Sequence, residues 1–269
     1  MKIVVITGAS SGIGLETAET FIKNGYEVVN LSRTPSGILK NNYTCDVSKE
    51  EEVKRVFEAI GSKYGKIDIL INCAGYGLSG ATELISASDA EKIFAVNVFG
   101  TLNCVRQTLP LMINGGKIIN VGSAMALFTV PFRGLYAASK AAVNSITYSL
   151  RMECAPFGIQ VCSICPGDVK TNFTKNRVKK FETNERYGER IKNATECVDS
   201  KEARRMPASK VAGAIYRQSK KKKTRPMTIV GFKYKFLHFV MRFLPLSWLL
   251  SATGSLLGGS KNTQKKKDF

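Results

Sequence analysis

Short runs of apolar and β-branched residues alternate with longer amphipathic segments along most of the chain. In order, the runs are KIVVIT, YEVVNLS, NYTCDV, IDILIN, GKIINVGS, IQVCSICP and MTIVG. Strands that alternate with helices indicate βαβ units, and continuously apolar strands are typical of a parallel sheet that is covered on both faces. The pattern therefore predicts an α/β fold with a Rossmann-like, doubly wound parallel sheet.

The chain shows no internal repeat and no Gly/Ser linker before about residue 257. Its length of 269 residues and its hydrophobic content of 44% suffice for one large core. We predict a single domain over residues 1–257 that ends in an apolar and basic helical extension, 232–257. The last segment, 258–269, has the composition of a disordered basic tail.

Charge is the unusual feature of the composition, because 40 Lys and Arg face 21 Asp and Glu, a formal net charge of +19. Much of the excess lies in the C-terminal hundred residues, including Lys220–Lys223 and Lys265–Lys267. Such a field attracts nucleotide phosphates, acidic lipid surfaces, anionic substrates or nucleic acid. Nucleic acid is the least favoured of these partners, since the lysine runs lack the interleaved aromatic residues of a single-strand binding groove.

The seven cysteines are irregularly spaced and no signal peptide precedes the first strand, which indicates free thiols in a reducing cytoplasm. Cys162 and Cys165 form a CxxC within a predicted strand, where residues three apart point to opposite faces. We interpret them as buried apolar side chains rather than as a redox pair. His238 is the only histidine, so the sequence predicts neither a metal site nor a Ser-His-Asp triad.

The first predicted strand is followed by ITGASSGIGLETAETFIKNG, in which Gly8, Gly12 and Gly14 precede a helix that ends at Gly25. Glycines let the backbone approach a pyrophosphate, and the N-terminus of the helix offers free N–H groups to it. This turn predicts nucleotide binding, with an ordinary structural turn as the alternative.

Tyr136 and Lys140 stand four residues apart in YAASK, a spacing that puts them on one face of a helix. A nearby ammonium group favours the phenolate, so we expect Lys140 to lower the pKa of Tyr136. The pair could then exchange a proton with an alcohol oxygen. Taken alone, the same two residues could equally be solvated polar positions on a helix surface.

Six motifs in this order resemble the short-chain dehydrogenase/reductase family over roughly residues 3–231. They are TGxxxGxG at Thr7, NCAG from Asn72, Asn97 in AVNVFG, Ser123 in NVGSAM, YAASK, and PGDVKT from Pro166 to Thr171. The segments NCAGYGLSG, NVFG, LPLM and APFGI are similar to those of the 17β-hydroxysteroid dehydrogenase-like branch. The resemblance implies an oxidoreductase that uses a nicotinamide cofactor, and a homodimer or homotetramer that pairs through helices near 89–113 and 136–155.

The resemblance also implies roles for individual residues. Tyr136 would be the acid or base and Ser123 would hydrogen-bond the substrate oxygen, while Lys140 would hold the nicotinamide ribose and Asn97 a water of the proton relay. The implied cofactor-binding residues are Gly8, Ser10, Ser11, Gly12, Ile13, Gly14, Arg33, Asp46, Val47, Asn72, Ala74, Gly75, Tyr136, Lys140, Val169 and Thr171.

The end of the second predicted strand bears on the choice of cofactor. NAD-preferring relatives carry an acidic residue there, whereas this chain has Ser32 followed by Arg33. Arginine pairs well with a 2′-phosphate, so the sequence favours NADP(H) over NAD(H). The alternative is that Arg33 is an ordinary exposed residue at a strand end.

The substrate is less defined. A long loop after Pro166, to about Pro207, mixes Phe173, Phe181 and Tyr187 with many basic residues. Further candidates for an apolar wall are Tyr76, Leu78, Met125, Leu127, Phe128 and Val130. An apolar cleft with a basic rim suits a ketone or alcohol that is lipid-like and carries an anionic end, such as a hydroxysteroid or bile acid. Retinoids, 3-oxoacyl compounds and other acyl ketones are alternatives. A non-catalytic NADP(H)-sensing or scaffold protein is a further one.

The segment 232–257 is strongly apolar but is interrupted by Lys233, Lys235, His238, Arg242 and Pro245. The interruptions leave no apolar stretch of about 20 residues, so we expect no membrane-spanning helix. Three alternatives remain: a helix on a membrane surface, a cover over the cleft, and a subunit interface.

Overall fold

The computed structural model describes residues 1–199 and 205–257. The tail that we predict to be disordered, 258–269, lies outside the described residues.

Seven parallel strands form the central sheet, in the order β11-β7-β6-β4-β1-β2-β3. Their bounds are β1 (Ile3–Thr7), β2 (Glu27–Ser32), β3 (Asn41–Thr44), β4 (Ile69–Asn72), β6 (Gly116–Val121), β7 (Ile159–Pro166) and β11 (Met227–Val230). Each overlaps one of the seven runs, which confirms the predicted strands, although β3 ends at Thr44 and leaves the last three residues of its run, 45–47, outside the strand. The strand order reverses between β1 and β4, and in such sheets ligands bind at the carboxyl ends of the strands on either side of that point.

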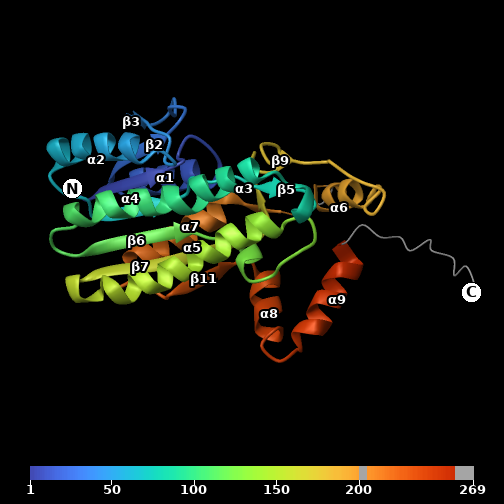
Figure 1. Cartoon of the computed structure of the whole chain (residues 1–269). Helices are drawn as coiled ribbons and strands as arrows, with labels where there is room; N and C mark the ends of the chain where they lie inside the picture. Colours follow the sequence, from blue (N-terminus) through green and yellow to red (C-terminus); the bar gives the residue numbers. More distant parts are fainter. Residues whose placement is uncertain (200–204, 258–269) are drawn as a thin grey trace, which may run out of the picture.

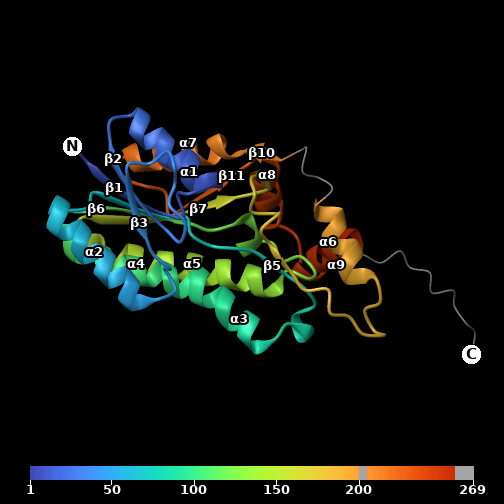
Figure 2. The same ribbon diagram turned by 90° about the horizontal axis from the view of Figure 1, so that it is seen from above.

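Helices cover both faces of the sheet (Figure 2). One face carries α1 (Gly12–Lys23) and α7 (Ala208–Lys220), and the other carries α2 (Glu50–Tyr64), α4 (Gly100–Thr108) and α5 (Gly134–Glu153). Phe57 of α2 packs with Val5 and Leu70 of the sheet on one side. On the opposite side, Phe21 of α1 packs with Ile6 and Ile119. The predicted doubly wound architecture is confirmed.

Both cysteines of the CxxC lie in β7 as free thiols, and neither side chain is exposed. Cys162 packs into the core beneath α1 and α7, whereas the Sγ of Cys165 lies near Asn144 and Ser163. Their interpretation as buried small side chains is confirmed.

Shorter elements gather beyond the carboxyl ends of the main strands (Figure 1). They are β5 (Leu78–Ser79), which pairs with β9 (Val178–Lys179), β8 (Val169–Lys170), which pairs with β10 (Met206–Pro207), α3 (Ala87–Phe94) and α6 (Arg190–Asp199). A π-helical turn, Ala95–Phe99, joins α3 to α4. Short 3₁₀ turns lie at Thr82–Leu84, Leu109–Leu111, Ala124–Ala126 and Ala155–Phe157.

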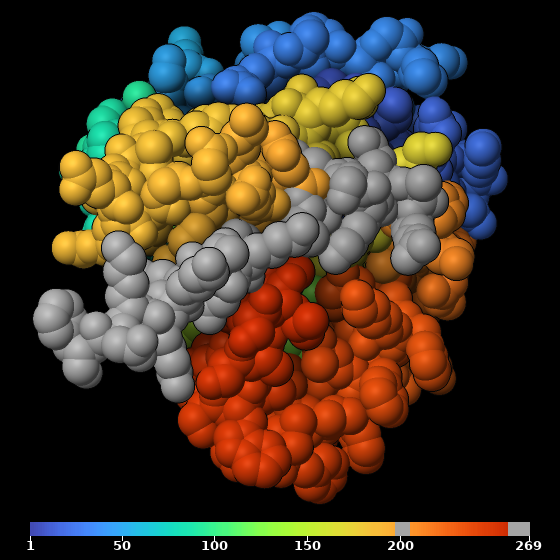
Figure 3. Space-filling model, turned by 90° about the vertical axis from the view of Figure 1, so that its right-hand side faces the viewer, coloured from blue at the N-terminus to red at the C-terminus, as the bar shows by residue number. Residues whose placement is uncertain are grey.

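The chain leaves β11 at Gly231 and forms α8 (Phe232–Val240) and α9 (Leu246–Leu257), which we call the hairpin, residues 232–257. Figure 1 shows α8 leading away from the sheet and α9 returning toward α6. Seen from this end of the molecule in Figure 3, the hairpin in red lies below the yellow and orange loop that contains α6. No helix among the described residues is both long enough and apolar enough to cross a bilayer.

Candidate active site

A cavity of about 1170 Å³ opens at the carboxyl ends of the strands, where the sequence predicts a nucleotide site. It is lined by residues of the glycine turn, by the ends of β2, β4 and β6, by the first turn of α5, and by the loop after β7. Of the predicted site residues, all but Asn72 and Asn97 line this cavity.

The glycine turn leaves no room for side chains. Gly8 has a φ of 69°, and a Cβ added to it would lie 3.0 Å from the Cα of Ala74. A Cβ on Gly14 would lie 2.3 Å from the carbonyl oxygen of Gly8, so the helix starts directly against the turn. The side chain of Ser11, the N-cap of α1, makes no capping hydrogen bond. The hydroxyl and the free N–H groups of this helix end therefore suit a phosphate group.

The end of β2 presents Ser32 and Arg33 to the cavity. The buried Ser32 hydroxyl accepts from Asn30 Nδ2 at 2.9 Å and donates to the carbonyl oxygen of Thr34 at 2.6 Å. Arg33 is exposed at the rim of the cavity. This strand end therefore offers a cation and no carboxylate to an adenine ribose.

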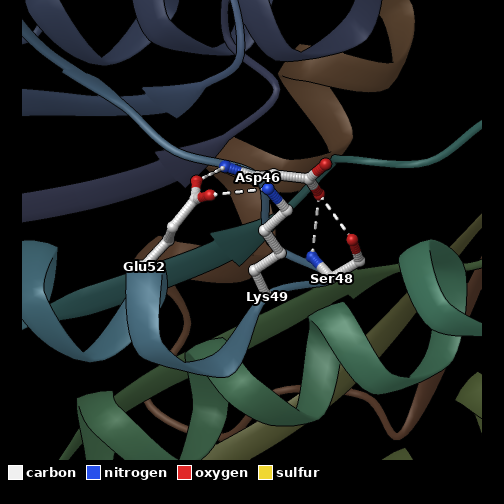
Figure 4. A network of polar contacts seen from close by, with 4 residues as sticks. All are labelled: Asp46, Ser48, Lys49 and Glu52. Carbon is white, nitrogen blue, oxygen red and sulfur yellow. Dashed lines mark hydrogen bonds and ion pairs between the residues drawn. The ribbon is translucent and has the colours of Figure 1, made fainter.

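Asp46 follows β3 and is held by its neighbours (Figure 4). Its Oδ1 accepts from the backbone N of Ser48 at 3.0 Å and from the Ser48 hydroxyl at 2.7 Å, while its own N donates to Glu52 at 2.9 Å. Burial acts to raise the pKa of Asp46, but the Ser48 hydrogen bonds and the charges of Arg33 and Lys49 together lower it. Figure 4 shows the second carboxylate oxygen pointing away from Ser48, so the ionised group can still accept another hydrogen bond.

The NCAG segment contributes mainly backbone to the cavity. The Thr7 hydroxyl accepts from the N–H groups of Cys73 (3.1 Å) and Ala74 (3.0 Å), which fixes the chain after β4. The Asn72 side chain lies inside the sheet instead, where its Nδ2 donates to Asn120 at 2.9 Å. Since β4 and β6 are neighbours, this amide ties two strands together beneath the cavity and does not line it.

Asn97 sits in the π-helical turn and is fully buried. Its amide accepts from the N of Tyr76 at 3.0 Å and donates to the O of Tyr76 at 3.1 Å and to Ser139 at 3.0 Å. A Cβ on Gly75 would lie 2.8 Å from Asn97 Oδ1 and 3.4 Å from Lys140 Nζ. Asn97 therefore holds the segment between β4 and α5 from behind the cavity wall, and its relation to a proton relay stays a prediction.

Ser123 and Tyr136 meet in the cavity wall. Ser123 follows β6 as the N-cap of the 3₁₀ turn Ala124–Ala126, and its hydroxyl accepts from Met125 N at 3.1 Å. Tyr136 comes from the first turn of α5. Burial raises the pKa of Tyr136, while a hydrogen bond with Ser123 and the charges of Arg177 and Arg133 act in the opposite direction. The phenol consequently stays protonated at neutral pH.

The expectation that Lys140 lowers the pKa of Tyr136 is wrong. The pKa of Tyr136 is raised, not lowered, and the positive charges that act on it are those of Arg177 and Arg133. Lys140 is itself buried, and its Nζ donates to the carbonyl oxygen of Val121 at 2.9 Å. Burial lowers the pKa of Lys140 to about 8, so its amine loses its positive charge at a lower pH than an exposed lysine does.

Only some of the residues that the sequence predicts for an apolar wall line the cavity near Tyr136. Tyr76, Met125, Phe128, Val130 and Phe173 line the cavity, and the Phe173 ring lies 5.8 Å from that of Tyr136. Leu78, Leu127, Phe181 and Tyr187 do not line it. Leu78 packs beneath Tyr136 instead, Phe181 is exposed, and Tyr187 contacts Phe132.

Sequence reasoning missed several lining residues. Arg133, three positions before Tyr136, is buried in the wall, and a helical spacing of three could have singled it out. Arg205 and the hairpin residues Tyr234, Leu237 and Leu249 also line the cavity. The cleft-cover alternative for segment 232–257 agrees with this lining, although the sequence does not single out these three residues. Arg205 is distant in sequence from every motif, so only the fold brings it here.

The far side of the cavity belongs to the loop after β7. Val169 and Thr171 line it, and a Cβ on Gly12 would lie 3.4 Å from the Thr171 side chain. The loop therefore approaches the glycine turn closely at this edge of the cavity. Glycine turn, rim arginine and Asp46 carboxylate together form a donor and acceptor set that fits a nicotinamide dinucleotide.

Among residues 1–199 and 205–257, no group of three or more His, Cys, Asp or Glu side chains lies in an arrangement that could hold a metal ion.

Comparison with known proteins agrees with this geometry. A family model described as short chain dehydrogenase matches residues 2–182. A probable short-chain type dehydrogenase/reductase, VdlC, from Helicobacter pylori is 36% identical, over 91% of this chain and 94% of the relative. A 3-ketodihydrosphingosine reductase from Bacteroides thetaiotaomicron is 35% identical, over 86% of this chain and 88% of the relative. The solved structure of ElxO with NADP bound superposes with a TM-score of 0.73 at 28% identity, over 87% of this chain and 99% of that one.

Proposed function

Since the chain belongs to the short-chain dehydrogenase/reductase family of oxidoreductases, we propose that it interconverts a ketone and a secondary alcohol on an apolar, lipid-like substrate with NADP(H). The observation that carries this proposal is the buried Tyr136 beside Ser123 in the wall of the cavity. A sensor or scaffold would have no use for this arrangement.

The residues of the chain divide the chemistry as follows. The nicotinamide cofactor, when bound, supplies or accepts the hydride. Ser123 hydrogen-bonds the substrate oxygen, and the Tyr136 hydroxyl gives its proton to that oxygen during reduction and takes it back during oxidation. Because burial raises the pKa of Tyr136, the protonated form prevails at neutral pH, which suits the reductive direction.

Arg33 supports NADP(H) as the cofactor. It lines the cavity at the end of β2, where Ser32 stands in place of an acidic residue. An arginine there can pair with a 2′-phosphate, whereas a carboxylate would repel it. The similarity to ElxO, whose structure contains NADP, points in the same direction.

The shape and lining of the cavity support a lipid-like substrate. Phe128, Val130 and Phe173 offer an apolar wall near Tyr136, and hairpin residues extend it. The similarity to a 3-ketodihydrosphingosine reductase favours a long-chain ketone over the hydroxysteroid or bile acid expected from sequence. The charges of Arg133 and Arg177, which act on the Tyr136 hydroxyl, favour a neutral or anionic group beside the ketone over a free amine.

A substrate panel tests this proposal. Purified protein is mixed with NADPH or NADH and with long-chain acyl ketones, 3-oxoacyl compounds, an amino ketone, ketosteroids, oxo bile acids and retinal, and cofactor absorbance is followed. We expect turnover with NADPH and a neutral or anionic acyl ketone. Faster turnover of a ketosteroid than of any acyl ketone would show that the preferred substrate is a ring system and not an acyl chain. Binding of NADPH without turnover of any ketone would favour the sensor.

A further inference from the structure

The hairpin has an inner face that belongs to the cavity. Tyr234 and Leu237 of α8 and Leu249 and Ala252 of α9 line it. On the body, the Phe128 ring lies 6.3 Å from the Tyr234 ring and 6.4 Å from that of His238, which holds α8 against the active site. The Tyr234 hydroxyl also donates to the Asp168 carboxylate. The inner face therefore has a defined partner.

The outer face of the hairpin has no partner within the described chain. Neither helix contains a buried residue. Nine large apolar side chains are exposed, with exposed fractions from 38% to 85%, against ten in all the other described residues. They are Phe232, Phe236, Phe239, Phe243, Leu244, Leu246, Trp248, Leu250 and Leu256. Leu256 also lines the cavity and Leu250 lines a small hollow beside Pro131, so the outer face consists of the other seven. Apolar side chains gathered at this density mark a binding surface.

The charge of the hairpin narrows the choice of partner. Residues 232–257 contain no Asp or Glu, and Lys235 and Arg242 are exposed among the aromatic side chains. Apolar side chains interspersed with basic ones, without acidic residues, are what an anionic lipid surface binds.

A second copy of the chain fits this surface less well. A two-fold contact through the hairpin would bring Lys235 and Arg242 against the same surface of the other copy, which offers no acidic residue. Lysine is also depleted at the centres of protein interfaces.

The lengths of the helices determine how they can meet a bilayer. With 9 and 12 residues, α8 and α9 rise about 14 and 18 Å, short of the ~30 Å hydrocarbon core. Both helices can lie in the interface between lipid and water, but neither can cross the hydrocarbon core. Phe243 and Leu244 lie in the turn between α8 and α9, and Trp248 lies in the first turn of α9. Figure 1 shows the turn as the part of the hairpin farthest from the body.

We propose that the outer face of the hairpin binds the surface of an anionic bilayer, with Phe243, Leu244 and Trp248 inserted among the lipids. The inner face then closes the cavity directly at that surface. The proposal concerns binding to lipid and does not depend on turnover of any ketone.

Trp248 is the single tryptophan of the chain and is 68% exposed, so its fluorescence reports on the hairpin alone. Full-length protein is titrated with phosphatidylcholine vesicles, with and without phosphatidylglycerol. We expect a blue shift with the anionic vesicles, quenching by lipids brominated in the acyl chain, and weaker binding at high salt. Unchanged emission together with no co-sedimentation at low salt would overturn the proposal.

Charge substitutions separate the hairpin from the general basic field. The double substitution Lys235→Gln and Arg242→Gln should weaken binding to anionic vesicles at least about tenfold, since each basic residue near the surface contributes on the order of 1 kcal/mol. Lys222→Gln with Lys223→Gln removes the same charge from exposed positions before β11 and serves as the matched control. Equal losses in both pairs would contradict a role of the hairpin.

Self-association is checked in the same samples. If the blue shift appears without lipid, grows with protein concentration and follows dimer formation in sedimentation equilibrium, the outer face binds a second copy and the membrane proposal is wrong. Since these measurements contain no ketone, the lipid proposal and the proposed function can fail independently.

Discussion

The body of the enzyme and its hairpin differ in where their large apolar side chains lie. In the body, Phe21 and Phe57 are almost completely buried between helices and sheet, whereas the Phe236 and Phe243 rings of the hairpin are mostly exposed. Tyr136, the proton donor that we propose, is buried like the large side chains of the body. Buried residues determine stability and chemistry here, and exposed ones determine contacts, so the effect of a substitution should decrease as exposure increases.

The largest effect is expected at the buried tyrosine. Tyr136→Phe removes the hydroxyl that we propose as the proton donor and keeps the ring, so turnover should fall at least ~10²-fold. NADPH affinity should be largely retained. Tyr148→Phe, on the same helix but 37% exposed, is the matched control and should be nearly silent. Near-normal turnover of Tyr136→Phe would show that the Tyr136 hydroxyl is not the proton donor.

A pH dependence of stability is expected from Lys140. Its pKa falls from 10.5 in the unfolded chain to about 8 in the fold. Between these values the unfolded state binds more protons, so the free energy of unfolding rises with pH across that window. Below pH 8 the burial cost is fully present, about 3 kcal/mol for this shift from 10.5 to about 8. Above pH 10.5 it is gone.

Urea unfolding of wild type and Lys140→Met measures this cost. The methionine carries no charge, so its stability advantage should be largest near pH 7 and should shrink as the pH rises beyond 8. Lys54→Met, at an exposed position of α2, corrects for the loss of a lysine as such. An advantage that stays constant with pH would show that Lys140 is not desolvated.

An intermediate effect is expected at the rim. Arg33→Ala should weaken NADPH binding by roughly 1.5–3 kcal/mol through loss of a charge-assisted contact, and leave NADH nearly unaffected. Isothermal titration with both cofactors gives the two affinities. Arg55→Ala, also exposed but outside the cavity lining, is the control. Equal losses for both cofactors would mean that Arg33 has a structural role only.

The smallest effect on stability is expected in the hairpin. Phe236→Ala should change the free energy of unfolding by no more than ~0.5 kcal/mol, because the ring is 60% exposed and leaves no cavity. Phe21→Ala, which empties a buried site, should cost about 3–5 kcal/mol in the same assay. If Phe236→Ala lowered the free energy of unfolding by more than ~1 kcal/mol, the exposed side chains of the hairpin would also contribute to stability, contrary to this prediction.

Local sequence patterns predicted what depends on neighbours along the chain. Most of the seven strands follow from runs rich in apolar and β-branched residues, and the turn at Gly8 follows from glycines placed where side chains would collide. The pKa of Tyr136 could not be predicted in this way, because a spacing of four fixes the helix face but not the direction of the Lys140 amine. That amine donates to the Val121 carbonyl, and the side chains that pack with Tyr136, among them Leu78 and Phe173, come from distant parts of the chain.

The cavity wall shows the same limit. Leu78 and Phe173 both appear apolar in sequence, yet Leu78 packs underneath Tyr136 while Phe173 reaches the cavity. In the hairpin, apolar residues occur on both faces, so periodicity alone could not tell which of them would line the site. Residues such as Arg205 enter the wall only through tertiary folding.

The connection between β11 and α8 divides the cavity wall along the sequence. β11 is an edge strand of the sheet, and the chain leaves it through Gly231, whose φ of 111° suits glycine. The hairpin is therefore continuous with the body through a single stretch of backbone near the end of the described chain, whereas the glycine turn lies near its start. A substitution in the hairpin can thus reshape one part of the cavity and leave the glycine turn unaltered.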